Sequence, residues 1–200
     1  MDAAQLNKIV AKYRPEVQSV PAIDLQYSIR YGDNALREVS QYSENIVKLA
    51  MKFAKVTSLI FSSTRRTIAD QARIMYDNCS RYSVSSVTAL KQARGWGYGP
   101  TGWAVEEVYF ANKSKPQLEV RKAMENKITE FLGQGKRTSL HCVDAATYKS
   151  RNIIDIPYSS VTSSKKQAFQ NSLFSMTKNI QNATYTLTRQ YDYIDLIIVE

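Results

Sequence analysis

The sequence contains very few of the side chains on which metal and disulfide chemistry depends. Among 200 residues there is one histidine, and there are two cysteines. Cys79 and Cys142 are far apart and form no CxxC pair, so neither a disulfide scaffold nor a thiolate zinc site is indicated, and we expect both to be small buried hydrophobic residues. Metal hydrolases use imidazole as ligand and proton carrier because it titrates near neutral pH. A single histidine therefore argues against a conventional metal hydrolase.

Long hydrophobic runs are also absent from the sequence. No segment approaches the roughly 18 apolar residues that a membrane-spanning helix needs. The opening segment, MDAAQLNKIVAKYRPEV, lacks the basic-then-apolar layout of a secretory signal. We therefore expect synthesis in the cytoplasm without a signal peptide, and no membrane partner.

Acidic residues are scarce relative to basic ones. The chain has 27 Lys and Arg against 18 Asp and Glu, a net charge of +9, and the basic excess is concentrated in residues 51–100. Such a field favours an anionic partner, either nucleic acid or a cell-wall polymer. The alternative is a solvated basic surface, because the charges form no dense tract and no nucleic-acid motif accompanies them.

The hydrophobic spacing predicts one α+β domain, residues 32–200, with a small antiparallel sheet packed against helices. Residues 1–31, which are broken by Pro15 and Pro21, are interpreted as an N-terminal arm. Apolar residues at helical spacing predict helices from Asp33 to about Lys55, from a Thr67 cap to Cys79, from Pro116 to Gly133, and from Ser163 or Ser164 onward. β-Branched and aromatic runs predict strands at 56–62, within 139–157, at 184–188 and at 193–199.

Glycine is scarce overall, yet four of the seven glycines lie in residues 95–103, together with Pro100 and both tryptophans. This composition predicts a loop without regular structure. An exposed loop of this kind would be a recognition surface, since aromatic side chains give large contact area at little entropic cost, and Trp96, Tyr98 and Trp103 are then the candidate interaction residues. The alternative is a loop folded back onto the core.

Three segments, in this order, resemble the motifs of a known family. Residues 63–76, STRRTIADQARIMY, are similar to an S-G-x-R-[ST]-x-x-x-Q signature and its following helix. Residues 139–148, SLHCVDAATY, resemble an S-x-H-x-x-G-x-A-x-D zinc motif, and residues 192–200, DYIDLIIVE, resemble a closing E-x-x-H strand. These motifs are typical of the zinc D-alanyl-D-alanine carboxypeptidases and L-alanyl-D-glutamate endopeptidases, which include many phage endolysins and share a fold with the hedgehog signalling domain. The resemblance implies a peptidase- or hedgehog-like fold over roughly residues 33–200.

The resemblance also implies which positions would form the metal site. His141 stands at the first zinc ligand, Tyr148 replaces the aspartate ligand, and Asp195 replaces the final histidine. Arg66 occupies the position of the substrate-polarising arginine and Asp192 that of the general base. Only one of the three ligands keeps its residue type, so we expect all five positions to be vestigial, with no catalytic residue, no metal and no other cofactor.

Two alternatives for these positions stay open. A shifted register would let Asp155 supply the end of the middle motif, so that Asp155, His141 and Asp195 could form a set of zinc ligands. Without a metal, the aspartates of the closing segment would instead pair with Arg65 or Arg66 in a salt-bridged pocket.

The leading functional hypothesis is a pseudoenzyme. The chain would be a non-catalytic structural or interaction component of a phage virion, in the tail, in the neck or associated with the capsid. Its partners would be other virion subunits or further copies of itself. One alternative is a peptidoglycan-degrading zinc peptidase with altered ligands, and a second is a cell-wall-binding module without the chemistry.

Overall fold

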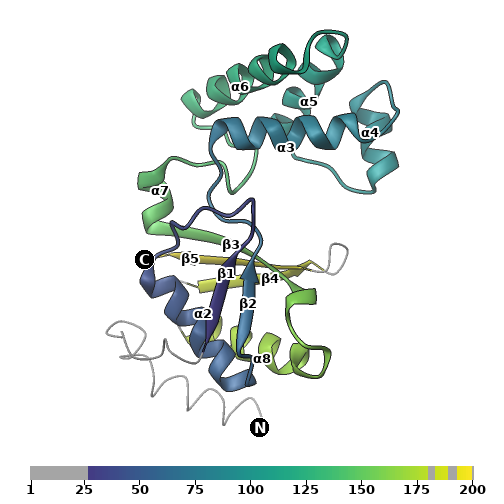
Figure 1. Ribbon diagram of the computed structural model, residues 1–200. Helices are drawn as coiled ribbons and strands as arrows, with labels where there is room; N and C mark the ends of the chain where they lie inside the picture. Colours follow the sequence, from purple (N-terminus) through teal and green to yellow (C-terminus); the bar gives the residue numbers. More distant parts are fainter. Residues whose placement is uncertain (1–26, 180–182, 189–192, 200) are drawn as a thin grey trace. The chain divides into compact units, whose positions relative to one another are not determined.

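The computed structural model describes residues 27–179, 183–188 and 193–199, and the chain divides into two compact units (Figure 1). Unit 1 contains the described residues up to Arg65 and those from Ala145 onward, and unit 2 is Arg66–Asp144. Helices and strands occur together, so the chain is of the mixed α+β class that the sequence predicted. Over the residues described, no helix combines the length and the hydrophobicity needed to cross a membrane.

The sheet of unit 1 is small and antiparallel. Its order is β3-β5-β4, formed by β3 (Arg151–Pro157), β5 (Tyr193–Val199) and β4 (Ala183–Thr188). Buried and half-buried residues alternate along β5, as expected for a strand with one face toward a core. The three strands lie where the sequence predicted them.

A second pair of strands in unit 1 is parallel. It joins β1 (Ser28–Tyr31) to β2 (Ser58–Phe61). Most of the predicted N-terminal arm lies outside the described residues, and its last residues form β1. Beyond β2, the Ser62 N–H donates to the Asp155 carbonyl at 2.8 Å and the Asp155 N–H donates to the Ser63 carbonyl at 2.9 Å. These bonds attach the segment after β2 to β3.

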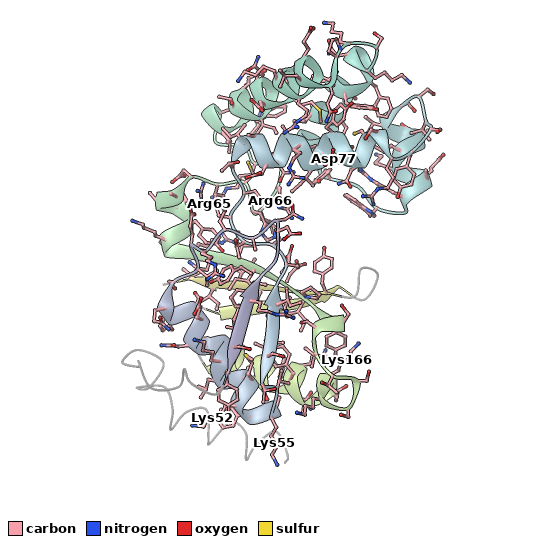
Figure 2. All side chains as sticks on the ribbon, viewed as in Figure 1. Lys52, Lys55, Arg65, Arg66, Asp77 and Lys166 are labelled. Atoms are coloured by element: carbon pink, nitrogen blue, oxygen red, sulfur yellow. The ribbon has the colours of Figure 1, made fainter. Side chains whose placement is uncertain are left out.

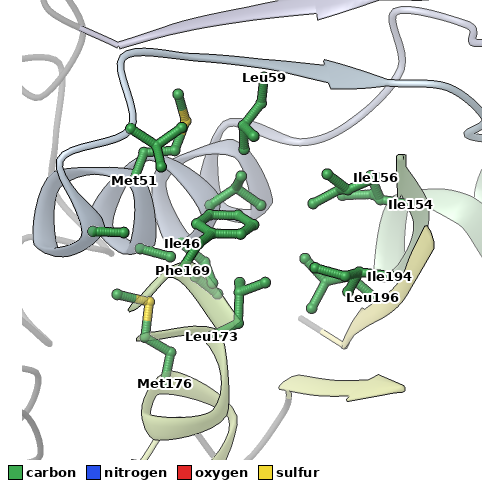
Figure 3. Packing of buried hydrophobic residues seen from close by; sticks show 14 of the residues in the cluster. Ile46, Met51, Leu59, Ile154, Ile156, Phe169, Leu173, Met176, Ile194 and Leu196 are labelled. Carbon is green, nitrogen blue, oxygen red and sulfur yellow. The ribbon is translucent and has the colours of Figure 1, made fainter. Parts of the chain in front are cut away.

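Two helices complete unit 1, α2 (Gln41–Ala54) and α8 (Lys166–Asn179). Their apolar faces pack with the buried faces of β2, β3 and β5 in one core (Figure 3). The labelled core residues are Ile46, Met51, Leu59, Ile154, Ile156, Phe169, Leu173, Met176, Ile194 and Leu196. Short helical segments connect these elements: α7 (Ala145–Ser150) before β3, and two 3₁₀ turns, Tyr158–Ser160 and Ser163–Lys165, before α8.

The predicted start of α2 at Asp33 is wrong. The helix begins at Gln41, because the Ser40 side chain accepts the Ser43 N–H at 3.1 Å and caps it there. Upstream, the Ala35 N–H donates to the Gly32 carbonyl in a turn. The predicted end near Lys55 is confirmed, since Lys55 has left-handed backbone geometry with φ of 55° and stops the helix.

Unit 2 consists mainly of helices. They are α3 (Ile68–Ser80), α4 (Val87–Arg94), α5 (Pro100–Asn112) and α6 (Gln117–Gly133). The predicted Thr67 cap is confirmed, because its hydroxyl accepts the Asp70 N–H at 3.1 Å. Cys79 and Cys142 are both free and buried, as expected. The core of unit 2 consists of Ala72, Met75, Val105, Val120, Met124, Ile128, Phe131 and Cys142.

Truncation of this core should destabilise unit 2. Met124 on α6 is fully buried, whereas Leu118 on the same helix is 79% exposed. We expect Met124→Ala to lower the free energy of unfolding by about 2–5 kcal/mol, because it removes buried methylenes and leaves a cavity. Leu118→Ala should change it by less than about 0.5 kcal/mol. Urea unfolding followed by tryptophan fluorescence reports on unit 2 directly, since both tryptophans lie there, and equal effects of the two substitutions would contradict the packing described.

Candidate functional site

The segments that carry the first two family-like motifs are adjacent in unit 2. The Arg66 N–H donates to the His141 carbonyl at 2.8 Å, and Arg66 and Cys142 form an isolated parallel bridge. His141 is buried, and its own N–H donates to the Ser139 hydroxyl at 3.3 Å. The structure therefore brings Arg66 and His141 together through the backbone.

The two neighbouring arginines lie where the chain passes from β2 to α3 (Figure 2). Arg65, in unit 1, forms a two-pronged ion pair with Glu38, with Nη2 2.8 Å from Oε1. Arg66, in unit 2, donates from Nη1 to the Gln71 side-chain oxygen at 3.3 Å. Asp192, one of the two aspartates expected to pair with Arg65 or Arg66, lies outside the described residues.

Tyr148, at the position of the aspartate ligand, belongs to the interior of unit 1. Its side chain is 1% exposed, and its hydroxyl donates to the Ile153 carbonyl at 2.9 Å. The Asn152 side-chain amide in turn donates to the Tyr148 carbonyl at 2.7 Å. Burial raises the pKa of the Tyr148 phenol well above its usual value. The phenol is therefore protonated at neutral pH and already engaged, so it does not fit the role of a metal ligand.

Asp195 faces a second carboxylate in unit 1. In the register of the antiparallel pair, Asp195 on β5 stands directly opposite Asp155 on β3, and both are half-buried. Opposite residues of this kind place their side chains on the same face of the sheet. Two members of the alternative ligand set are thus register partners, while His141 belongs to unit 2. Across the described ranges, no cluster of three or more His, Cys, Asp or Glu side chains could hold a metal ion.

The aromatic segment at 95–103 is only partly irregular. The predicted absence of regular structure is wrong from Pro100 onward, because α5 begins there with proline in the first turn, where its missing N–H costs nothing. Gly95 ends α4 with φ of 72°, and a Cβ on Gly102 would collide with the Tyr98 side chain. Gly95 therefore lets α4 end in a left-handed residue, and Gly102 lets the first turns of α5 pack closely against Tyr98.

The predicted interaction residues are half-buried and packed against cations. The Arg94 guanidinium lies 4.0 Å from the Trp96 ring centre and 5.5 Å from that of Tyr98. The Lys91 ammonium lies 3.6 Å from the centre of the Trp103 ring. Each contact is a cation–π interaction that fixes a ring in place. The segment thus combines the two alternatives of the sequence analysis, since the rings fold back but remain partly exposed.

A buried ion pair, which the sequence did not indicate, holds this segment. Arg94 Nη1 and Glu106 Oε1 are 2.6 Å apart, and both side chains are fully buried. Arg94 Nε also donates to the Trp96 carbonyl at 2.8 Å. Burial raises the pKa of Glu106 in spite of the arginine. Because the partners belong to different helices and no local motif links them, only the tertiary structure could reveal the pair.

A surface pocket of about 580 Å³ in unit 2 also lies outside the sequence predictions. It is formed by the end of α3, the segment 81–86, the first half of α4 and the end of α5. Its polar and aromatic lining consists of Ser80, Tyr82, Ser83, Ser85, Tyr109 and Lys113. A cluster of serines between two helices is an ordinary loop composition, so the sequence carried no signal for it.

Comparison with family models, with curated proteins and with solved structures finds no match for this chain.

The Tyr148 hydrogen bond should contribute to the stability of unit 1 and not to metal binding. We expect Tyr148→Phe to lower the free energy of unfolding by about 1 kcal/mol, because it leaves a buried carbonyl without this donor. Tyr27→Phe is the matched control, since the Tyr27 hydroxyl has no hydrogen-bond partner among the described residues. Urea unfolding followed by circular dichroism measures both, and a change in zinc content caused by Tyr148→Phe would refute this role.

Breaking the buried ion pair should be costly. Arg94→Met leaves the Glu106 carboxylate buried without its counter-charge, and we expect a loss of about 3–5 kcal/mol in the free energy of unfolding. Arg137→Met, at an exposed position, should cost less than about 0.5 kcal/mol. Tryptophan fluorescence during urea unfolding provides the measurement. Similar values for both substitutions would show that the pair does not hold unit 2 together.

Proposed function

We propose that this chain is a non-catalytic structural or interaction component, built on a peptidase-like framework that has lost its metal site, and that it serves in a phage virion. The observation that carries the proposal is the state of Tyr148. It occupies the position of an aspartate ligand in the resemblance, yet it is buried and donates its proton to the Ile153 carbonyl.

A working ligand at this position would be an ionised carboxylate with lone pairs directed at the metal. Converting the Tyr148 phenol into a ligand would require removal of its proton against a raised pKa and loss of the bond to Ile153. Both costs favour the protonated, hydrogen-bonded state. These costs support the proposal that Tyr148 is a structural core residue at a position where the enzymes that this chain resembles have a metal ligand.

The aromatic segment supports the interaction part of the proposal. Trp96, Tyr98 and Trp103 are partly exposed, and Arg94 and Lys91 hold the rings in fixed positions. Rings that are already ordered lose little entropy when a partner covers them. Such a surface suits stable contacts with other virion subunits or with further copies of the chain. The virion assignment itself rests on the resemblance to a family that is abundant in phages.

One observation favours a second candidate, the zinc peptidase with altered ligands. Asp155 and Asp195 stand opposite each other on one face of the sheet. Two carboxylates supply part of a ligand set, although a catalytic zinc requires about three protein ligands.

Elemental analysis beside a mass measurement separates the two candidates. Protein purified in the presence of zinc should carry no stoichiometric metal and should leave muropeptides uncleaved. Light scattering should give the mass of a defined multimer, or mass spectrometry should find the protein in particles from host cultures. Stoichiometric zinc that is lost in Asp155→Asn and Asp195→Asn, but kept in the exposed control Asp33→Asn, would establish the peptidase instead. Chelator-insensitive sedimentation with peptidoglycan would indicate a cell-wall-binding module.

A further inference from the structure

We propose that the pocket of unit 2, between the end of α3, the segment 81–86 and the end of α5, binds one nucleotide of a single-stranded nucleic acid. This inference does not depend on the proposed function, because a virion component and a peptidase could each carry such a site. It rests on the chemistry of the lining.

The charged part of the lining is a lysine without a neighbouring carboxylate. Lys113 is the charged residue of the pocket wall, which contains no Asp or Glu. Its Nζ lies 3.5 Å from the Val84 carbonyl oxygen, which also belongs to a residue of the lining. Among the described residues Lys113 makes no ion pair. An exposed ammonium with donors to spare is suited to a phosphate oxygen.

The aromatic part of the lining offers rings for stacking. Tyr82 lies in the loop, and Tyr109 belongs to α5. Tyr109 is held edge-on by two neighbours, Tyr76 at 5.4 Å and Phe110 at 5.2 Å between ring centres. A ring that is fixed in this way loses little entropy when a base stacks on it, and every base has a face for such a contact.

The remaining polar groups are hydroxyls. Ser83 and Ser85 are exposed at the pocket, and Ser80 is anchored by its bond to the Asp77 carbonyl at 3.2 Å. A hydroxyl donates one hydrogen bond and accepts others, so it can serve phosphate oxygens and base edges alike. Hydroxyls therefore give contacts without a strong preference for one base.

The combination favours a nucleic acid over other anionic partners. A polyanion without aromatic rings would contact Lys113 but would not stack on the two tyrosines. A neutral sugar would make no ion pair with the lysine. A volume of about 580 Å³ lies within the ordinary range for small-ligand sites. The net charge of +9 attracts a polyanion to the protein, and the pocket adds the local contacts.

Fluorescence anisotropy with two labelled oligonucleotides tests the proposal on the full chain. One is a 12-mer of deoxythymidine, and the other is an abasic 12-mer with the same phosphates. We expect the thymidine oligonucleotide to bind about five- to hundredfold more tightly, which is the range expected for stacking of one base. Tyr82→Ala should remove most of this difference. Lys113→Gln should weaken both oligonucleotides.

The matched control is Lys122→Gln. Lys122 is an exposed lysine of α6 that pairs with Glu125 at 3.0 Å, so the substitution removes the same charge outside the pocket lining. It should change both affinities less than twofold. If Lys122→Gln and Lys113→Gln had equal effects, or if the two oligonucleotides bound equally or not at all, the proposal would be overturned.

Two further measurements keep the test decisive. If circular dichroism shows that Tyr82→Ala is unfolded, Ser83→Glu replaces it, because it places a negative charge on an exposed residue of the lining. Unchanged binding of the thymidine oligonucleotide by Ser83→Glu would contradict the site. Displacement of that oligonucleotide by an equal concentration of an acidic oligosaccharide would assign the pocket to a glycan and overturn the proposal.

Discussion

The organisation of unit 2 depends on the burial of one guanidinium group. Arg94 ends α4, pairs with Glu106 on α5, donates to the Trp96 carbonyl and lies against two aromatic rings. The Glu106 carboxylate matches the charge of this buried arginine, and hydrogen bonds occupy its Nη1 and Nε, so the connection from α4 to α5 has little freedom. The same two helices contribute Tyr109 and other residues to the surface pocket. The ion pair thus joins two of the helices that contribute to the pocket, although neither partner lines it.

Unit 1 buries a neutral polar group, whereas unit 2 buries a charged one. At Tyr148 a phenol is buried whole, and its one donor is satisfied by the Ile153 carbonyl. Burial of this kind adds packing area and joins α7 to β3 through the Tyr148–Ile153 hydrogen bond. Asp155 and Asp195 are half-buried and stand opposite each other on the neighbouring strands.

Periodicity predicted the regular elements because each buries one face. Helix α6 and strand β5 lie close to their predicted bounds, since apolar residues recur at the helical and the alternating spacing. The errors arose where local chemistry has two interpretations. Asp33 is a good cap residue, but Ser40 caps α2, and Pro100 opens a helix although the same residue also breaks them. The pairing of Arg94 with Glu106 and the serine-lined pocket depend on tertiary contacts, which no local pattern encodes. Asp155 and Asp195 were brought together in the sequence analysis only through the family resemblance, and the register of β3 and β5 places them opposite each other.

Ion pairs in the folded chain reduce the unbalanced positive charge of residues 51–100. Three arginines of that segment are matched by acids: Arg65 by Glu38, Arg73 by Asp77 and Arg94 by Glu106. Two of these acids lie outside the segment, so counting along the sequence overstates the field that an approaching polyanion meets. A uniformly basic surface would bind any polyanion with a steep salt dependence, because many counterions would be released. With part of the charge neutralised internally, any discrimination between polyanions would come from local groups, such as aromatic rings with a lysine beside them.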